Sequence, residues 1–197
     1  MGQVLDAPAT RRPLAGLRER LVRRTPPTLQ DGVRPRRPRD LGTCTRLLNR
    51  AFFEGLFPGT RPPDPRAWLE GPDVLDAWVA ERDGDVVGHV ALLRPCTDVV
   101  RWREITGHLV DDVAVVGMLF VRPRYRGRGI GTAMVQAAAD EARARGLVAV
   151  NEVVGPAPLP HVHPPGDGWR LRASDRRPGA KAMWVHRFER VVQVEAL

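Results

Sequence analysis

Hydrophobic residues recur every three or four positions in two parts of the chain, which is the spacing of one helix face. The first stripe follows Asp40, a residue type that caps helix starts, and contains Leu41, Cys44, Leu47, Leu48, Ala51 and Phe52. The second stripe precedes Gly146, a residue suited to a helix end, and contains Ile130, Met134, Ala137 and Ala138. These patterns predict helices from Asp40 to about Phe53 and from the 126–131 region to about Arg145. Between them, Asp64-Pro65 favours a short helix to about Glu70.

Apolar runs without helical spacing predict strands. Residues 77–81 and 86–93 are two such runs, joined through Asp83-Gly84, a dipeptide suited to a tight hairpin turn. The run from Val113 to Val121 is continuously apolar, which indicates a central strand covered on both faces, with Gly117 marking a bulge or a close backbone approach. Three further strands are predicted at residues 147–154, 169–173 and 183–192. Residues 95–112 are of mixed polarity, and five prolines exclude a regular helix from residues 155–168.

This order of elements defines an α/β chain, because an antiparallel hairpin is followed by a strand, a turn, a helix and another strand. We expect a mixed sheet flanked by helices. With 197 residues and 43% hydrophobic content, the chain can bury one core. We expect one domain over residues 28–197, preceded by a basic, flexible extension over residues 1–27 that prolines interrupt.

The formal charge of +8 is concentrated near the amino-terminus. Residues 11–40 contain ten arginines and three acidic residues, so they account for +7 of it. A nucleic-acid or membrane-surface arm is one interpretation of this segment, and a solvated extension is the favoured one. There is a single lysine among 31 basic residues, as expected of a GC-rich coding sequence. Arginine content is therefore weak evidence for a partner.

No apolar run reaches the roughly eighteen residues needed to cross a membrane, and the amino-terminus lacks a secretory signal. We therefore expect a cytoplasmic protein without membrane association. Cys44 and Cys96 lack metal-ligand spacing, so we expect reduced thiols in or near the core and no metal site.

Residues 126–131, Arg-Gly-Arg-Gly-Ile-Gly, lie between a predicted strand and a predicted helix. A helix start leaves several backbone N–H groups without partners and carries partial positive charge, so it attracts phosphate oxygens. The three alternating glycines remove side chains that would keep a pyrophosphate away, and the two arginines can add charged hydrogen bonds. The loop therefore predicts a pyrophosphate site; the alternative is a tight turn with no ligand.

Two other kinds of phosphate loop fit less well. A Rossmann loop would come early in repeated parallel βαβ units, whereas this loop follows an antiparallel hairpin. A nucleoside-triphosphate loop would contain Gly-Lys-Ser or Gly-Lys-Thr, and this loop has no lysine.

Residues 116–146 resemble the central motif of the GCN5-related N-acetyltransferase (GNAT) family. The family pattern is Arg or Gln, two residues, Gly, one residue, then Gly or Ala, and Arg126, Gly129 and Gly131 meet it. Residues 118–123 and Tyr125 resemble the usual approach to the motif, and the order of predicted elements is similar from about Thr28 to Leu197.

The resemblance implies a twisted mixed sheet that splays at its middle and holds acetyl-CoA, as co-substrate, in the cleft. It implies that the backbone binds the cofactor at two places, the pantetheine arm at Leu119, Phe120 and Val121, and the pyrophosphate at Arg126, Gly127, Arg128, Gly129, Ile130, Gly131 and Thr132. It also implies an acyltransferase, namely an N-acetyltransferase that moves the acetyl group to a primary amine by direct attack in a ternary complex.

The catalytic residues stay unassigned. In the family, a tyrosine on the helix after the fifth strand often protonates the departing thiolate, but residues 155–168 replace that helix and Tyr125, the one tyrosine, belongs to the loop. Histidine titrates near neutral pH, so the candidate acids are His161 and His163. The candidate bases are acidic residues near the expected cleft: Glu152, Asp111, Asp112 and Glu104. The competing interpretation makes the histidines solvated surface residues and the acids rim charges or salt-bridge partners.

Acceptor choice would come from residues 52–76 and 95–112. The first segment is acidic, which would favour a cationic amine, through Glu54, Asp64, Glu70, Asp73 and Asp76. Its aromatic residues would form an apolar wall, namely Phe52, Phe53, Phe57 and Trp68. The alternative is that these acids are caps and surface charges and that these aromatics are core.

Two other functions stay open. The missing helix tyrosine is compatible with a catalytically silent acyl-CoA-binding module, and residues 11–40 are compatible with a nucleic-acid-binding protein. The sequence does not decide the acceptor or whether the protein forms a homodimer.

Overall fold

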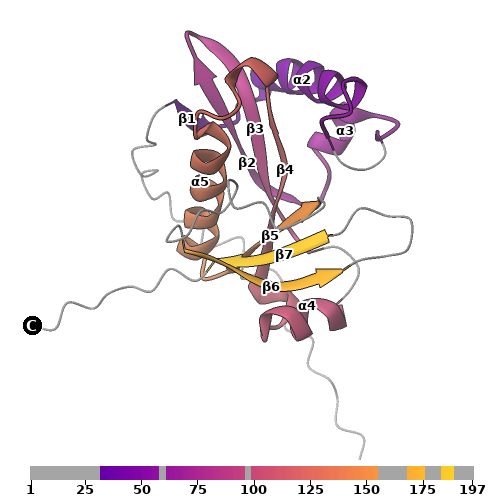
Figure 1. Ribbon diagram of the computed structural model, residues 1–197, viewed down its shortest axis with the longest axis vertical. Coiled ribbons are helices and arrows are strands. Elements are labelled where there is room, and N and C mark those ends of the chain that lie inside the picture. The colour runs from indigo at the N-terminus through magenta and orange to yellow at the C-terminus, as the bar shows by residue number, and fades with distance from the viewer. Residues whose placement is uncertain (1–31, 58–60, 96–98, 155–167, 176–182, 189–197) are drawn as a thin grey trace, which may run out of the picture.

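The computed structural model describes residues 32–57, 61–95, 99–154, 168–175 and 183–188. Within this part of the chain, seven strands form one sheet in the order β1-β2-β3-β4-β5-β7-β6 (Figure 1). β4 and β5 are parallel, and the other neighbouring strands are antiparallel. The predicted α/β chain with a mixed sheet flanked by helices is confirmed.

The amino-terminal half contains the predicted helices and hairpin. The helix α2 spans Leu41–Phe53, and α3 spans Pro65–Leu69, where the Asp64 carboxylate caps the first turn by accepting two backbone N–H groups. β2 (Val74–Arg82) and β3 (Asp85–Leu93) form the hairpin, and Asp83 and Gly84 take the positive φ angles that its turn requires. The strand β1 (Val33–Pro35) and the 3-10 turn η1 (Pro38–Asp40) were not predicted, because such short elements carry no periodic pattern.

Asp40 occupies the N-cap position of α2, as predicted, but its side chain makes no cap hydrogen bond to the helix. It is the last residue of η1, and its carboxylate turns back to accept the N–H of Arg37 at 2.7 Å and two bonds from the Arg34 guanidinium at 2.6 and 3.0 Å. Arg34 also donates to Glu81 at 2.7 Å. The guanidinium beside Asp40 holds the pKa of that carboxyl below its usual range. This ion-pair network ties β1 and β2 to the start of α2.

The carboxy-terminal half is built around the strand–loop–helix unit. β4 spans Val113–Val121, η3 spans Pro123–Tyr125, α5 spans Ile130–Ala144 and β5 spans Val148–Val154. β6 (Trp169–Asp175) and β7 (Met183–Phe188) complete the sheet, so each predicted strand is present, although residues 189–192 of the last predicted strand lie outside the described residues. A helix α4 (Val99–Thr106) and a turn η2 (Val110–Asp112) occupy the segment of mixed polarity, where no element was predicted.

Helices cover both faces of the sheet (Figure 1). α5 packs on one face, over a buried cluster that includes Val90, Val116, Met134 and Ala138. α2 and α3 pack on the other face, over a second cluster that includes Leu48, Leu69, Val79 and Phe120. A third cluster, under α4, contains Trp102, Val113, Val115 and Val150.

Cys44 is a buried free thiol in α2, as predicted, and burial raises its pKa to about 11. Cys96 lies outside the described residues. No helix in the described ranges is both long and apolar enough to span a membrane.

β4 is paired on both sides over only part of its length. Val113 to Val116 pair with residues 148–151 of β5, after which β5 pairs with β7 alone. Val113–Val116 are buried, whereas residues 117–119 and 121 are half-buried. The prediction that both faces of the strand are covered also holds for its second half, since Leu119 and Val121 pack against the cluster under α5, and Met118 and Phe120 belong to the cluster under α2. What the second half lacks is a neighbouring strand on the β5 side, so the sheet splays there.

Candidate functional site

The loop between β4 and α5 leaves backbone donors open. Gly127 and Gly129 have φ angles of 71° and 76°, a region that side chains disfavour. Gly129 is the N-cap of α5 and supplies no side-chain cap. Within the described part of the chain, the N–H groups of Ile130, Gly131 and Thr132 have no hydrogen-bond partner, and the first bonded one is Ala133, which donates to Gly129 at 2.9 Å. The helix start therefore presents unpaired donors, as the loop pattern predicted.

The space beside the glycines is open. A Cβ added to Gly127 or Gly129 would meet no described atom within 4 Å. One added to Gly131 would meet Val121 at 3.9 Å and Leu119 at 4.0 Å, which are ordinary contact distances. Alanine would fit at position 131 and would stabilise the helix by about 0.5–1 kcal/mol. Internal packing therefore gives no reason for Gly131, whereas a ligand resting on the helix start does.

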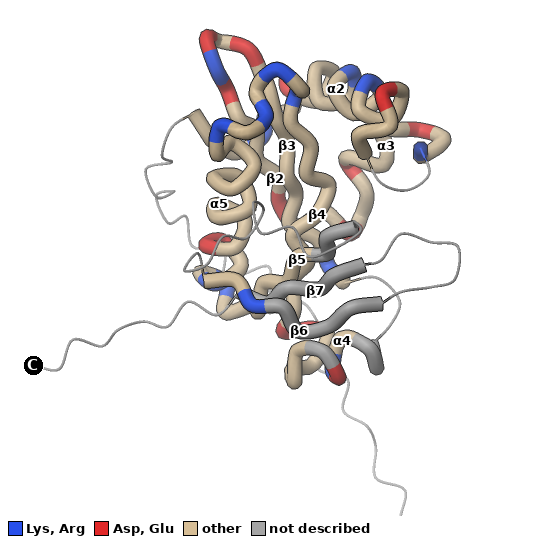
Figure 2. The backbone as a smooth tube through the Cα atoms, in the orientation of Figure 1, with Lys and Arg blue, Asp and Glu red and all other residues tan. Residues whose placement is uncertain are grey.

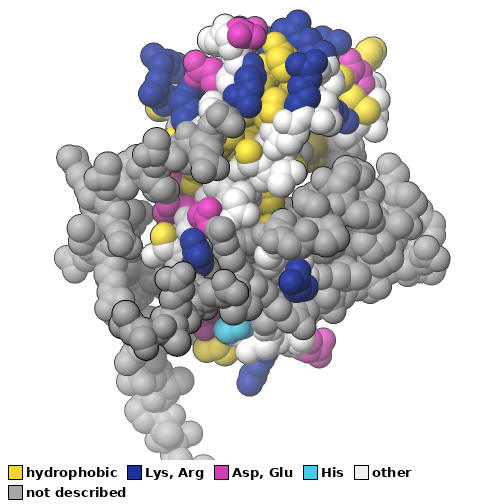
Figure 3. Space-filling model, turned by 60° about the vertical axis from the view of Figure 1, so that its left-hand side comes forward, with side chains coloured by type: hydrophobic (Ala, Val, Ile, Leu, Met, Phe, Trp, Pro, Cys, Tyr) yellow, Lys and Arg dark blue, Asp and Glu magenta, His cyan; other side chains and the backbone are white. Residues whose placement is uncertain are grey.

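The arginines of this loop are partly engaged by the protein. The Arg126 Nε donates to the Val121 carbonyl at 3.0 Å, and the guanidinium groups of Arg124 and Arg128 lie 4.8 and 5.8 Å from the centroid of the Tyr125 ring. Figure 2 shows the basic segments of the loop above α5, and Figure 3 shows basic side chains gathered around hydrophobic surface at that end of the molecule. The site is thus electropositive from both its side chains and the helix dipole.

The ladder sets which backbone groups of β4 face the cleft. Arg122 N–H donates to the Val87 carbonyl at 2.8 Å, and the register pairs Phe120 with His89. Hydrogen-bonded pairs recur every second residue in an antiparallel ladder, so the peptide groups of Phe120 also face β3. Those of Val121 face the side that β5 has left. Of the three predicted pantetheine contacts, Val121 is therefore an outward donor, whereas Leu119 lies in an irregular part of the ladder where this alternation does not apply.

Asn151 lies where the sheet divides, and the sequence analysis had not selected it. Its buried side chain donates from Nδ2 to the Val116 carbonyl at 2.7 Å, and Val116 is the last β4 residue that pairs with β5. A polar residue after three apolar ones in the strand was the available signal. Asn151 satisfies a carbonyl that would lose its partner as the strands part.

The predicted acids and bases are spread over the molecule. Glu104 is exposed on α4, and Asp111 and Asp112 are exposed in η2. That turn precedes β4, whereas the glycine loop follows it, and nine strand residues span about 30 Å. The Glu152 side chain lies outside the described ones, and so do His161, His163 and the proline-rich residues 155–167.

The predicted acceptor region is largely made of caps, ion pairs and packed rings. Asp64 caps α3, Glu54 pairs with Arg50 at 2.7 Å, Glu70 lies 3.7 Å from Arg66, and Asp76 pairs with Arg145. Asp73 is exposed.

The aromatic residues of this region divide in the same way. Phe57 packs against Phe52, Trp68 and Phe120, with ring centroids 4.8, 5.9 and 6.3 Å away. Phe53 is 93% exposed and contributes to no wall. The caps-and-core alternative therefore fits this region better, with Phe57 and Trp68 half-buried at its edge.

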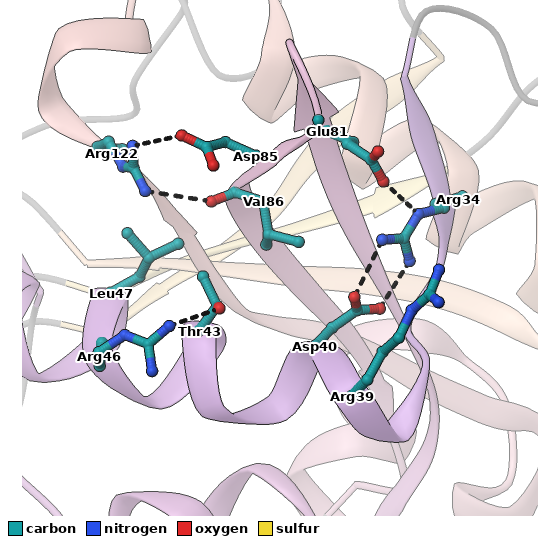
Figure 4. Close-up of a pocket in the computed structure, with 11 residues that line it drawn as sticks. Arg34, Arg39, Asp40, Thr43, Arg46, Leu47, Glu81, Asp85, Val86 and Arg122 are labelled. Atoms are coloured by element: carbon teal, nitrogen blue, oxygen red, sulfur yellow. Dashed lines mark hydrogen bonds and ion pairs between the residues drawn. The ribbon is translucent and has the colours of Figure 1, made fainter.

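A cavity between α2 and the β2–β3 turn is lined by Arg122, the first residue of this loop, but by none of the loop's glycines (Figure 4). It is lined by charges of both signs, Arg34, Arg39, Arg46, Arg122, Asp40, Glu81 and Asp85. Dashed contacts in Figure 4 show that Arg34 and Arg122 are held by the acids. No group of three or more His, Cys, Asp or Glu residues in the described ranges could hold a metal ion.

Comparisons with known proteins agree with this arrangement. The model of the acetyltransferase (GNAT) family matches residues 42–157. No curated protein matches the chain. Among solved structures, the ribosomal-protein-alanine N-acetyltransferase from Brucella melitensis is 20% identical with a TM-score of 0.60, and the match covers 80% of this chain and 98% of that one.

Two further structures contain a cofactor. YncA from Salmonella typhimurium, solved with its cofactor acetyl-CoA, is 19% identical with a TM-score of 0.59, covering 83% of this chain and 98% of that one. An aminoglycoside 6'-N-acetyltransferase complexed with coenzyme A is 12% identical with a TM-score of 0.60, covering 83% and 99%. At these identities the likeness shows a shared fold.

The chain belongs to the acetyltransferase (GNAT) family, because the family model matches more than half of it. Its class is therefore that of an acyltransferase, and the resemblance noted in the sequence is confirmed.

Proposed function

We propose that the protein is an N-acetyltransferase that transfers an acetyl group from acetyl-CoA to a primary amine. The observation that carries the proposal is the open start of α5, where three N–H groups lack partners in the described structure and the glycines beside them leave free space. A diphosphate fits such a site, because it accepts several hydrogen bonds and its charge is stabilised by the helix dipole. Acetyl-CoA and coenzyme A bound to two structural neighbours support this choice.

The residues would hold the co-substrate in two stretches. The amides of residues 126–132 would bind the pyrophosphate. The N–H groups of Leu119 and Val121 would pair with the amides of the pantetheine arm, because the departure of β5 leaves this edge of β4 without a neighbouring strand.

The reaction needs no covalent enzyme intermediate. The neutral amine nitrogen attacks the thioester carbonyl carbon, the carbon–sulfur bond breaks, a base takes the proton of the amine, and the departing thiolate takes a proton. Holding both reactants in one cleft supplies much of the rate. The general acid and base are not assigned, since the candidate histidines lie outside the described residues.

A thermal-shift titration tests the cofactor site. Acetyl-CoA in large excess over its Kd should raise the melting temperature, and at 100 times Kd the stabilisation is about 2.7 kcal/mol. Acetyl-pantetheine, which keeps the pantetheine arm but lacks the diphosphate, is the matched control and should give a much smaller shift at the same concentration. Equal shifts from both compounds, or none from acetyl-CoA, would contradict the proposed site.

A second assay separates an enzyme from a silent binding module. Release of the coenzyme A thiol is followed across a panel of small-molecule and peptide amines. Thiol release that depends on one amine class supports the transferase. Protection by acetyl-CoA without release for any amine would support the silent acyl-CoA-binding module instead.

A further inference from the structure

A fully buried histidine lies next to the cleft and has no part in the function proposed above. His89 is on β3, is 0% exposed, and its ring stacks on Phe120 with centroids 5.0 Å apart and planes inclined by 13°. It lies on the face of the sheet that α2 covers, opposite Val79 of β2. Burying an imidazole is costly unless its nitrogens are hydrogen-bonded.

Both nitrogens of His89 have partners, and these partners determine its protonation. Nδ1 lies 3.0 Å from the carbonyl oxygen of Met118, and Nε2 lies 3.1 Å from the Arg36 guanidinium. A carbonyl only accepts and a guanidinium only donates, so His89 is neutral and carries its proton on Nδ1. Burial agrees with this, since it lowers the pKa of His89 to about 4.

Arg36 is itself fixed by two other elements. Its guanidinium donates to the Leu69 carbonyl at the end of α3 at 2.8 Å, and its backbone N–H donates to the Ala77 carbonyl of β2, also at 2.8 Å. A chain of hydrogen bonds therefore connects α3 and β2 to β4, and it runs from Arg36 through the buried His89 to Met118.

Met118 is the strained residue of β4. The register pairs Ala91 with Gly117 and His89 with Phe120, so Val90 alone faces two residues of β4, which defines a bulge. Met118 has φ of 51°, a left-handed conformation that costs about 1–2 kcal/mol outside glycine. The bulge turns the Met118 carbonyl out of the ladder, and His89 supplies the hydrogen bond that it would otherwise lack.

The same bond orients the next amide. The described peptide bonds are trans, so the N–H of Leu119 points opposite to the carbonyl of Met118. With that carbonyl held by His89, the Leu119 N–H is directed away from the α2 face. We propose that the Arg36–His89 pair is a positioning device that holds the Met118–Leu119 peptide in the orientation that presents the Leu119 N–H to the thioester arm, an inference that rests on the function proposed above.

Two substitutions separate the two nitrogens of the ring. His89→Asn places an amide donor near the position of Nδ1 and keeps the bond to Met118. His89→Gln places an amide near Nε2, which preserves the contact with Arg36 and loses the bond to Met118. Val79→Ala is the matched control, because it removes buried volume directly opposite His89 without touching the bulge.

The dissociation constant of acetyl-CoA is measured by calorimetry for each variant, together with the free energy of unfolding in urea. We expect His89→Asn to bind within about threefold of the parent, His89→Gln to bind about tenfold more weakly, and Val79→Ala to lose stability with unchanged affinity. Affinity that falls in step with stability across all three variants, or equal affinity for the Asn and Gln variants, would overturn the inference.

Two measurements keep the outcome decisive. Should His89→Gln fail to fold, Arg36→Met is the alternative variant, because it removes the contact with Nε2 of His89 and leaves the bond from Nδ1 to Met118. We expect this variant to bind acetyl-CoA about threefold more weakly than the parent. Unchanged binding would overturn the role of Arg36. A crystal structure of His89→Gln without ligand should show Met118 away from positive φ. If Met118 keeps its positive φ in that variant, the inference is overturned even when the protein binds acetyl-CoA. If the parent protein binds no acetyl-CoA, the proposed function is overturned.

Discussion

The two halves of β4 have similar apolar sequences and different surroundings. Val113–Val116 are buried and paired with β5, and Val115 and Val116 are also paired with β3, whereas residues 117–119 and 121 are half-buried and have no partner in β5. The first half contributes to the core, and the second offers backbone groups to a ligand. Apolar character alone therefore does not separate a structural strand from a binding edge; the path of the neighbouring strand does.

The largest expected effect lies in the loop that follows the half-buried part of β4. Gly129→Val adds a side chain to the helix start at a position with φ of 76°, so it should weaken acetyl-CoA binding by at least about 100-fold. Gly84→Val is the matched control, because Gly84 has φ of 80°, has equally open space and lies in the β2–β3 turn. Calorimetric titration compares the two. Equal losses of affinity in the two variants would show that the loss comes from backbone strain and not from blocking the glycine loop.

Val116→Ala tests the buried half. It removes two methyl groups from a residue that is 0% exposed, so unfolding in urea should become easier by about 2 kcal/mol. Because Val116 lies before the point where β5 leaves β4, the affinity for acetyl-CoA should stay within about twofold of the parent value. A tenfold loss of affinity at unchanged stability would mean that the two halves of β4 are not functionally distinct.

Asp40→Asn tests a region expected to contribute stability only. The folded-state pKa of Asp40 lies below 3.8, so its contribution is present above pH 3.8 and is lost as the pH falls through the folded-state value. The parent should exceed the variant by about 2 kcal/mol in unfolding free energy at pH 7, and this difference should shrink in acid. A difference that does not change with pH would contradict the ion pair with Arg34.

Gly131→Ala has the smallest expected effect on stability, and it should raise the free energy of unfolding while lowering the affinity for acetyl-CoA. Alanine fits and favours the helix, so unfolding free energy should rise by about 0.5–1 kcal/mol. Its methyl group should crowd a diphosphate at the helix start and weaken binding about tenfold. A gain of stability with unchanged affinity would argue against the proposed diphosphate site at the start of α5.

Local signals predicted most of the fold. The 3.6-residue stripes predicted α2 and α5, Asp83-Gly84 predicted the hairpin turn, and the continuous run 113–121 predicted β4 with its bounds. The three alternating glycines predicted a loop whose donors are open in the structure.

The remaining features depend on tertiary contacts. The side chain of Asp40 binds Arg34, which lies on another element, and the local sequence does not predict this contact. The helix α4 was missed because its buried stripe, with Trp102 and Thr106, is short. The bulge was expected at Gly117, and its positive φ falls on Met118, whose carbonyl contacts the buried His89, a partner from another strand.

The central claim is that unpaired amides at the start of α5 bind a diphosphate. Its most direct test is a crystal structure of the protein with acetyl-CoA. We predict pyrophosphate oxygens about 3 Å from the backbone nitrogens of Gly129 to Thr132. A bound cofactor whose diphosphate lies elsewhere, with these nitrogens unliganded, would contradict the account.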